Sequence, residues 1–148
     1  MTAARTSKHS VDTAEELRAA AARGDMAVAR RLLEAGAAPN AFDETGLAAL
    51  HHAAEGEHFE MVGLLLTHGA AINGRDQSRI ANTPLAEVAG NCSLRMAILL
   101  IEAGANPTLR GWMQLNALDR SRSRKRGDGP AVHDLLVRAA QSWAPGVQ

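Results

Sequence analysis

The chain has 148 residues, enough for one domain, and its 16 basic and 16 acidic residues give no net charge at neutral pH. This balance excludes a global electrostatic attraction to nucleic acid or to membrane surfaces. One cysteine excludes an internal disulfide, and no apolar leader or long apolar run is found, so we expect a cytoplasmic protein.

One segment occurs three times along the chain. Its Gly-Ala steps begin at Gly36, Gly69 and Gly104, so the intervals are 69 − 36 = 33 and 104 − 69 = 35 residues. A leucine lies nineteen residues before each step, at Leu17, Leu50 and Leu85. The two extra residues of the longer interval therefore lie in the loop between Asn73 and Leu85. A period of this size predicts a solenoid of stacked units.

Each unit is predicted to be a helical hairpin. In the first unit Thr13 and Glu16 have the spacing of a capping box, so we expect a helix to begin there. In the third, Thr83 is suited to the N-cap and Pro84 to the first helical position. A second helix with one apolar face follows in each unit and ends at the repeated glycine, which adopts a left-handed conformation without steric cost.

The fourth unit is degenerate. Leu118 lies 118 − 85 = 33 residues after Leu85, but the second apolar face, which includes Val132 and Leu136, arrives two residues late. The glycines and proline of residues 127–130 predict a longer turn between its helices. We therefore divide the chain into repeats at about 12–43, 44–76, 77–110 and 111–143, between a flexible N-terminal tail at 1–11 and a C-terminal tail at 144–148.

This pattern resembles the ankyrin repeat, whose period is 33 and whose signature is Thr-Pro-Leu-His-x-Ala. The signature is divided between units, because residues 83–85 supply its first part and Leu50, His51 and Ala53 supply its second. The resemblance covers about residues 12–143. It implies an all-α ankyrin-repeat solenoid of about four helical hairpins with short loop or β-hairpin fingers.

Proteins that resemble ankyrin arrays bind other proteins through their loop tips and the concave face of their first helices. The resemblance thus implies a non-enzymatic adaptor, or an inhibitor of the immunity type, that is monomeric when free. The tip positions are Phe42, Asp43, Glu44, Arg75, Asp76, Gln77, Ser78, Arg79, Arg110, Trp112 and Met113. The groove positions are Ala19, His52, Glu55, Glu87, Asn91 and Arg120. Trp112 is either an interface hot spot or a residue that packs across the fourth unit.

A basic segment lies in the fourth unit, where residues 119–148 carry six basic against three acidic residues. Its members are Arg120, Arg122, Arg124, Lys125 and Arg126. Three interpretations are open: a solvated cap face, a site for an acidic protein partner, or a nucleic-acid site. No aromatic residue separates the arginines, so nucleic acid is the least favoured.

The histidines and the cysteine are the remaining candidates for chemistry. His51 and His58 match ankyrin histidines that hydrogen-bond the backbone between units, and no cysteine or carboxylate completes a metal site around His52. We therefore predict no metal and no other cofactor. Cys92 is either a small residue in a turn that Gly90 and Asn91 make possible, since both residue types accept left-handed geometry, or a redox group that implies a role in oxidative-stress defence.

No catalytic motif is found, and a thin solenoid has no deep pocket by default, so we expect no enzyme. Arginine outnumbers lysine by 14 to 2, which indicates a GC-rich coding sequence and favours a bacterial source.

Overall fold

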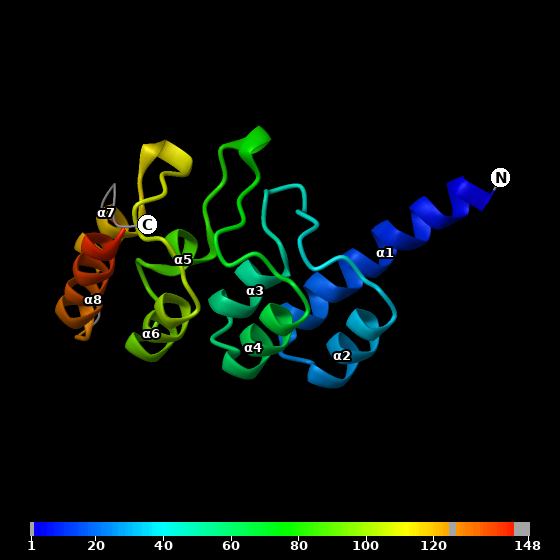
Figure 1. Cartoon of the computed structure of the whole chain (residues 1–148), viewed down its shortest axis with the longest axis horizontal. Helices are drawn as coiled ribbons and strands as arrows, with labels where there is room; N and C mark the ends of the chain where they lie inside the picture. The colour runs from blue at the N-terminus through cyan, green and yellow to red at the C-terminus, as the bar shows by residue number, and fades with distance from the viewer. Residues whose placement is uncertain (1, 125–126, 144–148) are drawn as a thin grey trace.

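A computed structural model of the protein describes residues 2–124 and 127–143, with side chains from Asp12 onward. Its helices are α1 (Thr2–Arg23), α2 (Met26–Glu34), α3 (Ala49–Glu55), α4 (Phe59–Thr67), α5 (Pro84–Val88), α6 (Leu94–Glu102), α7 (Ala117–Arg122) and α8 (Gly129–Ser142). Two short 3₁₀ turns, η1 (Gln77–Arg79) and η2 (Trp112–Gln114), lie in the connections. No strand occurs in these described residues, and the predicted all-α solenoid of four helical hairpins is confirmed (Figure 1).

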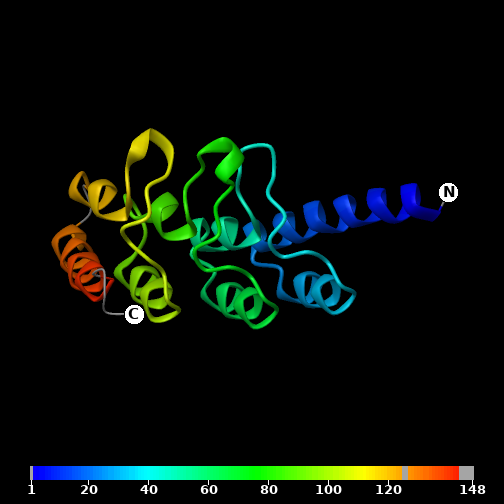
Figure 2. The same ribbon diagram turned by 45° about the horizontal axis from the view of Figure 1, so that its top comes forward.

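The hairpins stack in two rows. Figure 2 shows the first helices, α1, α3, α5 and α7, along one row and the second helices, α2, α4, α6 and α8, along the other. Each first helix packs against the next, and α6 packs against α8. Alanines such as Ala20, Ala53 and Ala89 are fully buried, which lets neighbouring first helices approach closely. Leu65 and Leu100 fill the same core from the second helices.

Backbone hydrogen bonds repeat from unit to unit. Gly36, Gly69 and Gly104 have φ angles of +96°, +92° and +99°, so the predicted left-handed helix ends are confirmed. The Asn40 amide donates to Gly69 O at 3.0 Å, and its oxygen accepts from Ala71 N at 2.8 Å. Asn73 makes the same pair of bonds one unit later. These asparagines fix the spacing between consecutive units.

Three loops, which we call fingers, project from one edge of the stack (Figure 1). Finger 1 comprises residues 41–47, finger 2 residues 74–82 and finger 3 residues 109–115. Finger 2 contains the two extra residues that the sequence placed before Leu85, and η1 lies within it. All three fingers connect a second helix to the first helix of the next unit, so they lie above the row of first helices.

Two local predictions are wrong. Helix α1 begins at Thr2, so the segment at 2–11 is helical, and Thr13 and Glu16 lie inside a helix instead of forming a capping box. Gly90 and Asn91 are not left-handed, because α5 ends early at Val88 and the turn closes through bonds from Asn91 N and Cys92 N to Val88 O. The tail at 144–148 lies outside the described residues.

Candidate functional site

An aspartate organises the first finger. Asp43 Oδ1 accepts hydrogen bonds from Thr45 N at 2.9 Å, from the Thr45 hydroxyl at 2.6 Å and from Leu47 N at 3.0 Å. Its other oxygen lies 3.0 Å from His52 Nε2 on α3. Burial by itself raises the pKa of Asp43, but the bonds from Thr45, Leu47 and His52 outweigh it and hold the pKa well below its usual range. Asp43 is therefore a fixed negative charge beside the groove.

A hollow of about 700 Å³ lies between finger 1 and the first helices. It is lined by Glu15, Arg18, Ala19, Ala22, Phe42, Asp43, Glu44, Thr45, His52 and Arg79. The Arg18 guanidinium donates to Ala41 O at 3.0 Å, so α1 supports the base of the finger. The structure thus brings together four predicted site residues of finger 1 and α3, namely Phe42, Asp43, Glu44 and His52. It adds Glu15 and Arg18, which were not predicted from the sequence.

The second hollow, of about 340 Å³, is built around Asn82. Asn82 Oδ1 accepts from Trp112 N at 2.9 Å and from Arg120 Nη2 at 3.2 Å, and its amide donates to Glu87 at 2.8 Å. Arg120 also donates to Trp112 O at 3.1 Å. A Cβ at Gly111 would collide with Asn82, so only glycine lets finger 3 approach this side chain. Asn82 thereby joins Glu87, Trp112 and Arg120, which the sequence predicted separately.

Sequence reasoning missed Asn82, although a pattern was available to find it. The leucine register of the repeats places Leu47 and Leu115 at the equivalent positions of the second and fourth units. A buried amide where two other units have leucine indicates a local hydrogen-bonding requirement.

Arginines tie the fingers to one another. Arg79 on finger 2 donates to Glu44 O of finger 1 at 2.7 Å and lies 3.2 Å from Asp76. Arg75 donates to Arg110 O of finger 3. The predicted tip residues of separate units therefore form one connected surface.

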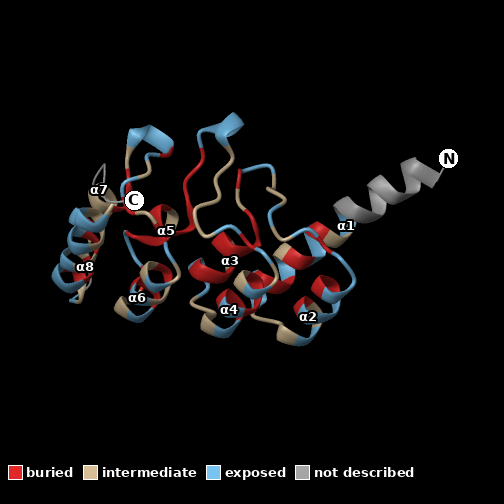
Figure 3. Cartoon of the chain, viewed as in Figure 1, coloured by how far each residue is buried: buried red, intermediate tan, exposed pale blue. Residues whose placement is uncertain are grey.

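Large apolar side chains stand exposed on fingers 2 and 3. Ile80 is 58% exposed, Trp112 is 60% exposed and Met113 is 65% exposed, and in Figure 3 the tips of both fingers are coloured as exposed. Of the two interpretations of Trp112, this exposure favours the interface residue over packing across the fourth unit. Ile80 has a φ of +53° and Met113 a φ of +60°, so both lie in the left-handed region. Few residues other than glycine adopt it, and a β-branched residue such as isoleucine is a genuine outlier there. Such strain gathers at functional sites, and Ile80 was not among the predicted residues.

Replacing Ile80 by asparagine is expected to stabilise the protein by about 0.5–1 kcal/mol, because asparagine tolerates the left-handed conformation that costs isoleucine about 1–2 kcal/mol. Urea unfolding followed by circular dichroism measures the change. Ile98→Asn on α6 is the control, since Ile98 is a partly exposed isoleucine inside a helix and gains nothing from asparagine. A loss of stability in Ile80→Asn would contradict the assignment of strain to this residue.

The remaining predicted residues are not gathered into one site. Glu55 is exposed at the end of α3, and Asn91 is exposed in a turn, whereas Gln77 lines a hollow with Arg75 and Arg110. The structure contradicts the predicted basic patch at Arg124. Arg120 faces Asn82 and Arg122 is exposed, whereas the Arg124 side chain is only 1% exposed. Lys125 and Arg126 lie outside the described residues.

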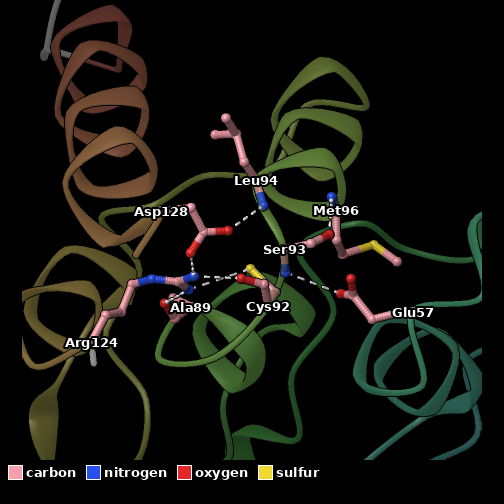
Figure 4. A network of polar contacts seen from close by, with 8 residues as sticks. All are labelled: Glu57, Ala89, Cys92, Ser93, Leu94, Met96, Arg124 and Asp128. Atoms are coloured by element: carbon pink, nitrogen blue, oxygen red, sulfur yellow. Dashed lines mark hydrogen bonds and ion pairs between the residues drawn. The ribbon is translucent and has the colours of Figure 1, made fainter. Parts of the chain in front are cut away.

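Arg124 belongs to a buried network between the third and fourth units (Figure 4). It donates to Ala89 O at 2.9 Å, to Cys92 O at 2.6 Å and to Asp128 at 2.8 Å. Asp128 also accepts from Leu94 N at 3.2 Å, at the start of α6. The network closes the long turn between α7 and α8 against the neighbouring unit, so its role is structural.

Cys92 lies inside this network and is 3% exposed. Burial raises the pKa of its thiol, and the nearby Arg124 only partly offsets that effect. Reactive cysteines are exposed and have lowered pKa values. The structure therefore favours the small structural residue over the redox group.

Two histidines connect neighbouring units, as predicted. His51 Nδ1 accepts from Ala48 N at 3.1 Å, so its Nε2 donates to Asn82 O at 2.7 Å. His58 Nε2 donates to Ala22 O at 2.9 Å. No group of three potential metal ligands occurs among the described residues, and none of the described helices is long and apolar enough to cross a membrane.

Comparison with known proteins gives a family assignment. Residues 17–111 match the family described as Ankyrin repeats (3 copies). The chain is 36% identical over 87 residues to the Caenorhabditis elegans ankyrin repeat and KH domain-containing protein mask-1, and 38% identical over 91 residues to the mouse nuclear factor NF-kappa-B p105 subunit. These matches cover 59% and 61% of this chain but only 3% and 9% of the relatives. Because the family match spans more than half of the sequence, the chain belongs to the ankyrin-repeat family.

Proposed function

We propose that this chain is a non-enzymatic adaptor, or an inhibitor of the immunity type, that engages one protein partner through its three fingers and the adjoining groove. The observation that carries the proposal is the exposure of Ile80, Trp112 and Met113 on fingers 2 and 3. Exposed large apolar side chains that are clustered and bordered by polar residues mark interaction sites.

The family supports the coarser part of this proposal. Ankyrin repeats generally serve as protein–protein interaction modules and are generally non-enzymatic. The fingers add a physical reason, because arginine links hold the three tips in one arrangement before any partner arrives. A preorganised surface loses less entropy on binding. A cytoplasmic location, a bacterial source and a monomeric free state remain predictions from the sequence.

The two alternatives have less support. A nucleic-acid or acidic-ligand site at residues 120–126 needs a row of exposed cations, yet the Arg124 side chain is buried and Arg120 is only partly exposed, facing Asn82 and Trp112. A role in oxidative-stress defence needs a reactive thiol, yet Cys92 is buried with a raised pKa.

Affinity capture tests the proposal. The purified chain is expected to retain one stoichiometric protein from a lysate of its source organism, and purified partner then gives the Kd. A finger variant with Arg75, Arg79, Arg110 and Trp112 changed to alanine is expected to weaken binding at least about 30-fold, since hot-spot truncation typically costs 2 kcal/mol or more. Its helical melting must match the wild type.

A control variant removes the same number of arginines elsewhere. Arg30 and Arg31 on α2 and Arg138 on α8 are exposed. Their change to alanine removes three positive charges, as in the finger variant, but leaves the fingers intact. Binding by this variant should equal that of the wild type. Equal loss in both variants, or capture that nuclease abolishes, would defeat the assignment to fingers and groove.

A further inference from the structure

The exposed apolar residues of fingers 2 and 3 lie among arginines. We define the fingertip patch as Ile80, Trp112, Met113, Arg75, Arg79 and Arg110. Ile80 lines the 340 Å³ hollow together with Arg79 and Trp112, and a neighbouring hollow of about 320 Å³ together with Arg75 and Arg110. Ile80 therefore connects the two halves of the patch.

The positive charge of the patch faces solvent. The Arg79 and Arg110 side chains are 54% and 59% exposed, whereas the carboxylates that pair with them, Asp76 and Asp119, are 15% and 27% exposed. Asp76 is further occupied by hydrogen bonds from Ser78. Both carboxylates are thus less exposed than the arginines. Fingers 2 and 3 themselves carry three arginines against one aspartate, a net charge of 3 − 1 = +2, and Asp119, the partner of Arg110, lies on α7.

The opposite sign occurs at the other end of the row. Finger 1 carries Asp43 and Glu44 and no basic residue, a net charge of −2. The hollow that these two carboxylates line also contains Glu15, Arg18 and Arg79, so its formal charge is 2 − 3 = −1. The net charge therefore changes sign along the row of fingers, from negative at finger 1 to positive at fingers 2 and 3.

We propose that the fingertip patch binds an acidic segment of the partner protein in which carboxylates flank a large apolar side chain. This inference rests on the proposed function. The apolar side chain packs between Ile80 and Trp112, and the flanking carboxylates meet the arginine guanidinium groups. Arginine suits this role because its planar group pairs with carboxylates through two parallel hydrogen bonds. Basic residues of the same segment lie toward finger 1.

A polypeptide fits this surface better than a nucleic acid. A phosphate backbone is negative along its whole length, so its extension past the patch brings it against Asp43 and Glu44. A protein segment can reverse its charge from residue to residue and match both ends. Complementary charge of this kind chiefly determines which partner is selected and how fast it arrives.

Selection from a phage library that displays random 16-residue peptides tests the inference on the full chain. The expected result is enrichment of peptides with at least two aspartates or glutamates around a leucine, phenylalanine, tyrosine or tryptophan. A fluorescein-labelled copy of the most enriched peptide is then titrated by anisotropy. We expect Arg75→Ala, Arg79→Ala and Arg110→Ala together to weaken its binding at least 10-fold, and raised salt to weaken it too.

Two matched variants exclude a merely structural effect. The variant with Arg30, Arg31 and Arg138 changed to alanine should bind the peptide within 2-fold of the wild type. Ile80→Asn should weaken binding at least 10-fold without loss of stability, which a folding defect cannot produce.

Enrichment of basic or uncharged peptides, or the absence of any enrichment, would overturn the inference. So would acidic peptides whose binding the triple arginine variant leaves unchanged, or tighter patch-dependent binding of a labelled 16-nucleotide single strand. If affinity capture still yields a partner that depends on the fingers, the proposed function stands and only the chemistry assigned to the partner fails.

Discussion

Replacing Arg124 by alanine is expected to lower the free energy of unfolding by about 3 kcal/mol, because removal of the buried guanidinium takes a charged partner from Asp128 and donors from two backbone carbonyls. Asp128 would lose the guanidinium that lies 2.8 Å away. The carbonyl groups of Ala89 and Cys92 would lose donors at 2.9 and 2.6 Å. Each acceptor left buried without a partner adds to the loss.

The loss should be local in origin. A solenoid unit contacts only its neighbours, so the C-terminal hairpin α7–α8 depends on the interface that Arg124 closes. Hydrogen exchange is therefore expected to increase first in α7 and α8, while α1 to α4 keep their protection.

Arg122→Ala is the matched control for this prediction. Arg122 ends α7, two residues before Arg124, and is exposed. Its removal should change the free energy of unfolding by less than about 0.5 kcal/mol in the same urea titration. Equal effects of the two variants would show that the network does not hold the fourth unit.

The contrast between these arginines shows where sequence reasoning stops. In the run from Arg120 to Arg126 the cations alternate with serines or follow one another, so nothing in the sequence distinguishes Arg124 from its neighbours. Arg124 is buried because its partners are Asp128, four residues later, and the carbonyl of Cys92, thirty-two residues earlier. Tertiary contacts of that kind leave no periodic trace in one sequence.

The fold was predictable because its determinants are local and repeated. Gly36, Gly69 and Gly104 each end a helix in the left-handed conformation, and the same glycine recurs in three units. The start of α1 was not predictable from Thr13, because the residues upstream contain no glycine or proline to stop a helix. The repeat pattern was enough to locate the finger loops. The strained backbone at Ile80 and the hydrogen bonds that converge on the Asn82 side chain depend on contacts between units.

His51 carries the second large expected effect. His51→Leu should lower the free energy of unfolding by about 3 kcal/mol at pH 7, although leucine nearly fills the same volume. The imidazole is 1% exposed and bonds both Ala48 N and Asn82 O, so leucine leaves a buried donor and a buried acceptor without partners. Because Asn82 also holds Trp112, finger 3 should lose order together with stability.

The pH dependence of this difference tests the assigned protonation state. Burial lowers the pKa of His51, an effect that the bond to Asn82 and the charge of Glu87 only partly offset. The unfolded chain takes up a proton below about pH 6.5, while folded His51 stays neutral until its own lower pKa is reached. The stability that His51 contributes is therefore complete above pH 6.5 and declines as the pH falls, by at most about 1.4 kcal/mol per pH unit. Urea titrations of wild type and His51→Leu from pH 8 to 5 should show their difference shrinking. A constant difference would mean that folded His51 takes up its proton at the same pH as the unfolded chain, which the bond from Ala48 N to Nδ1 opposes.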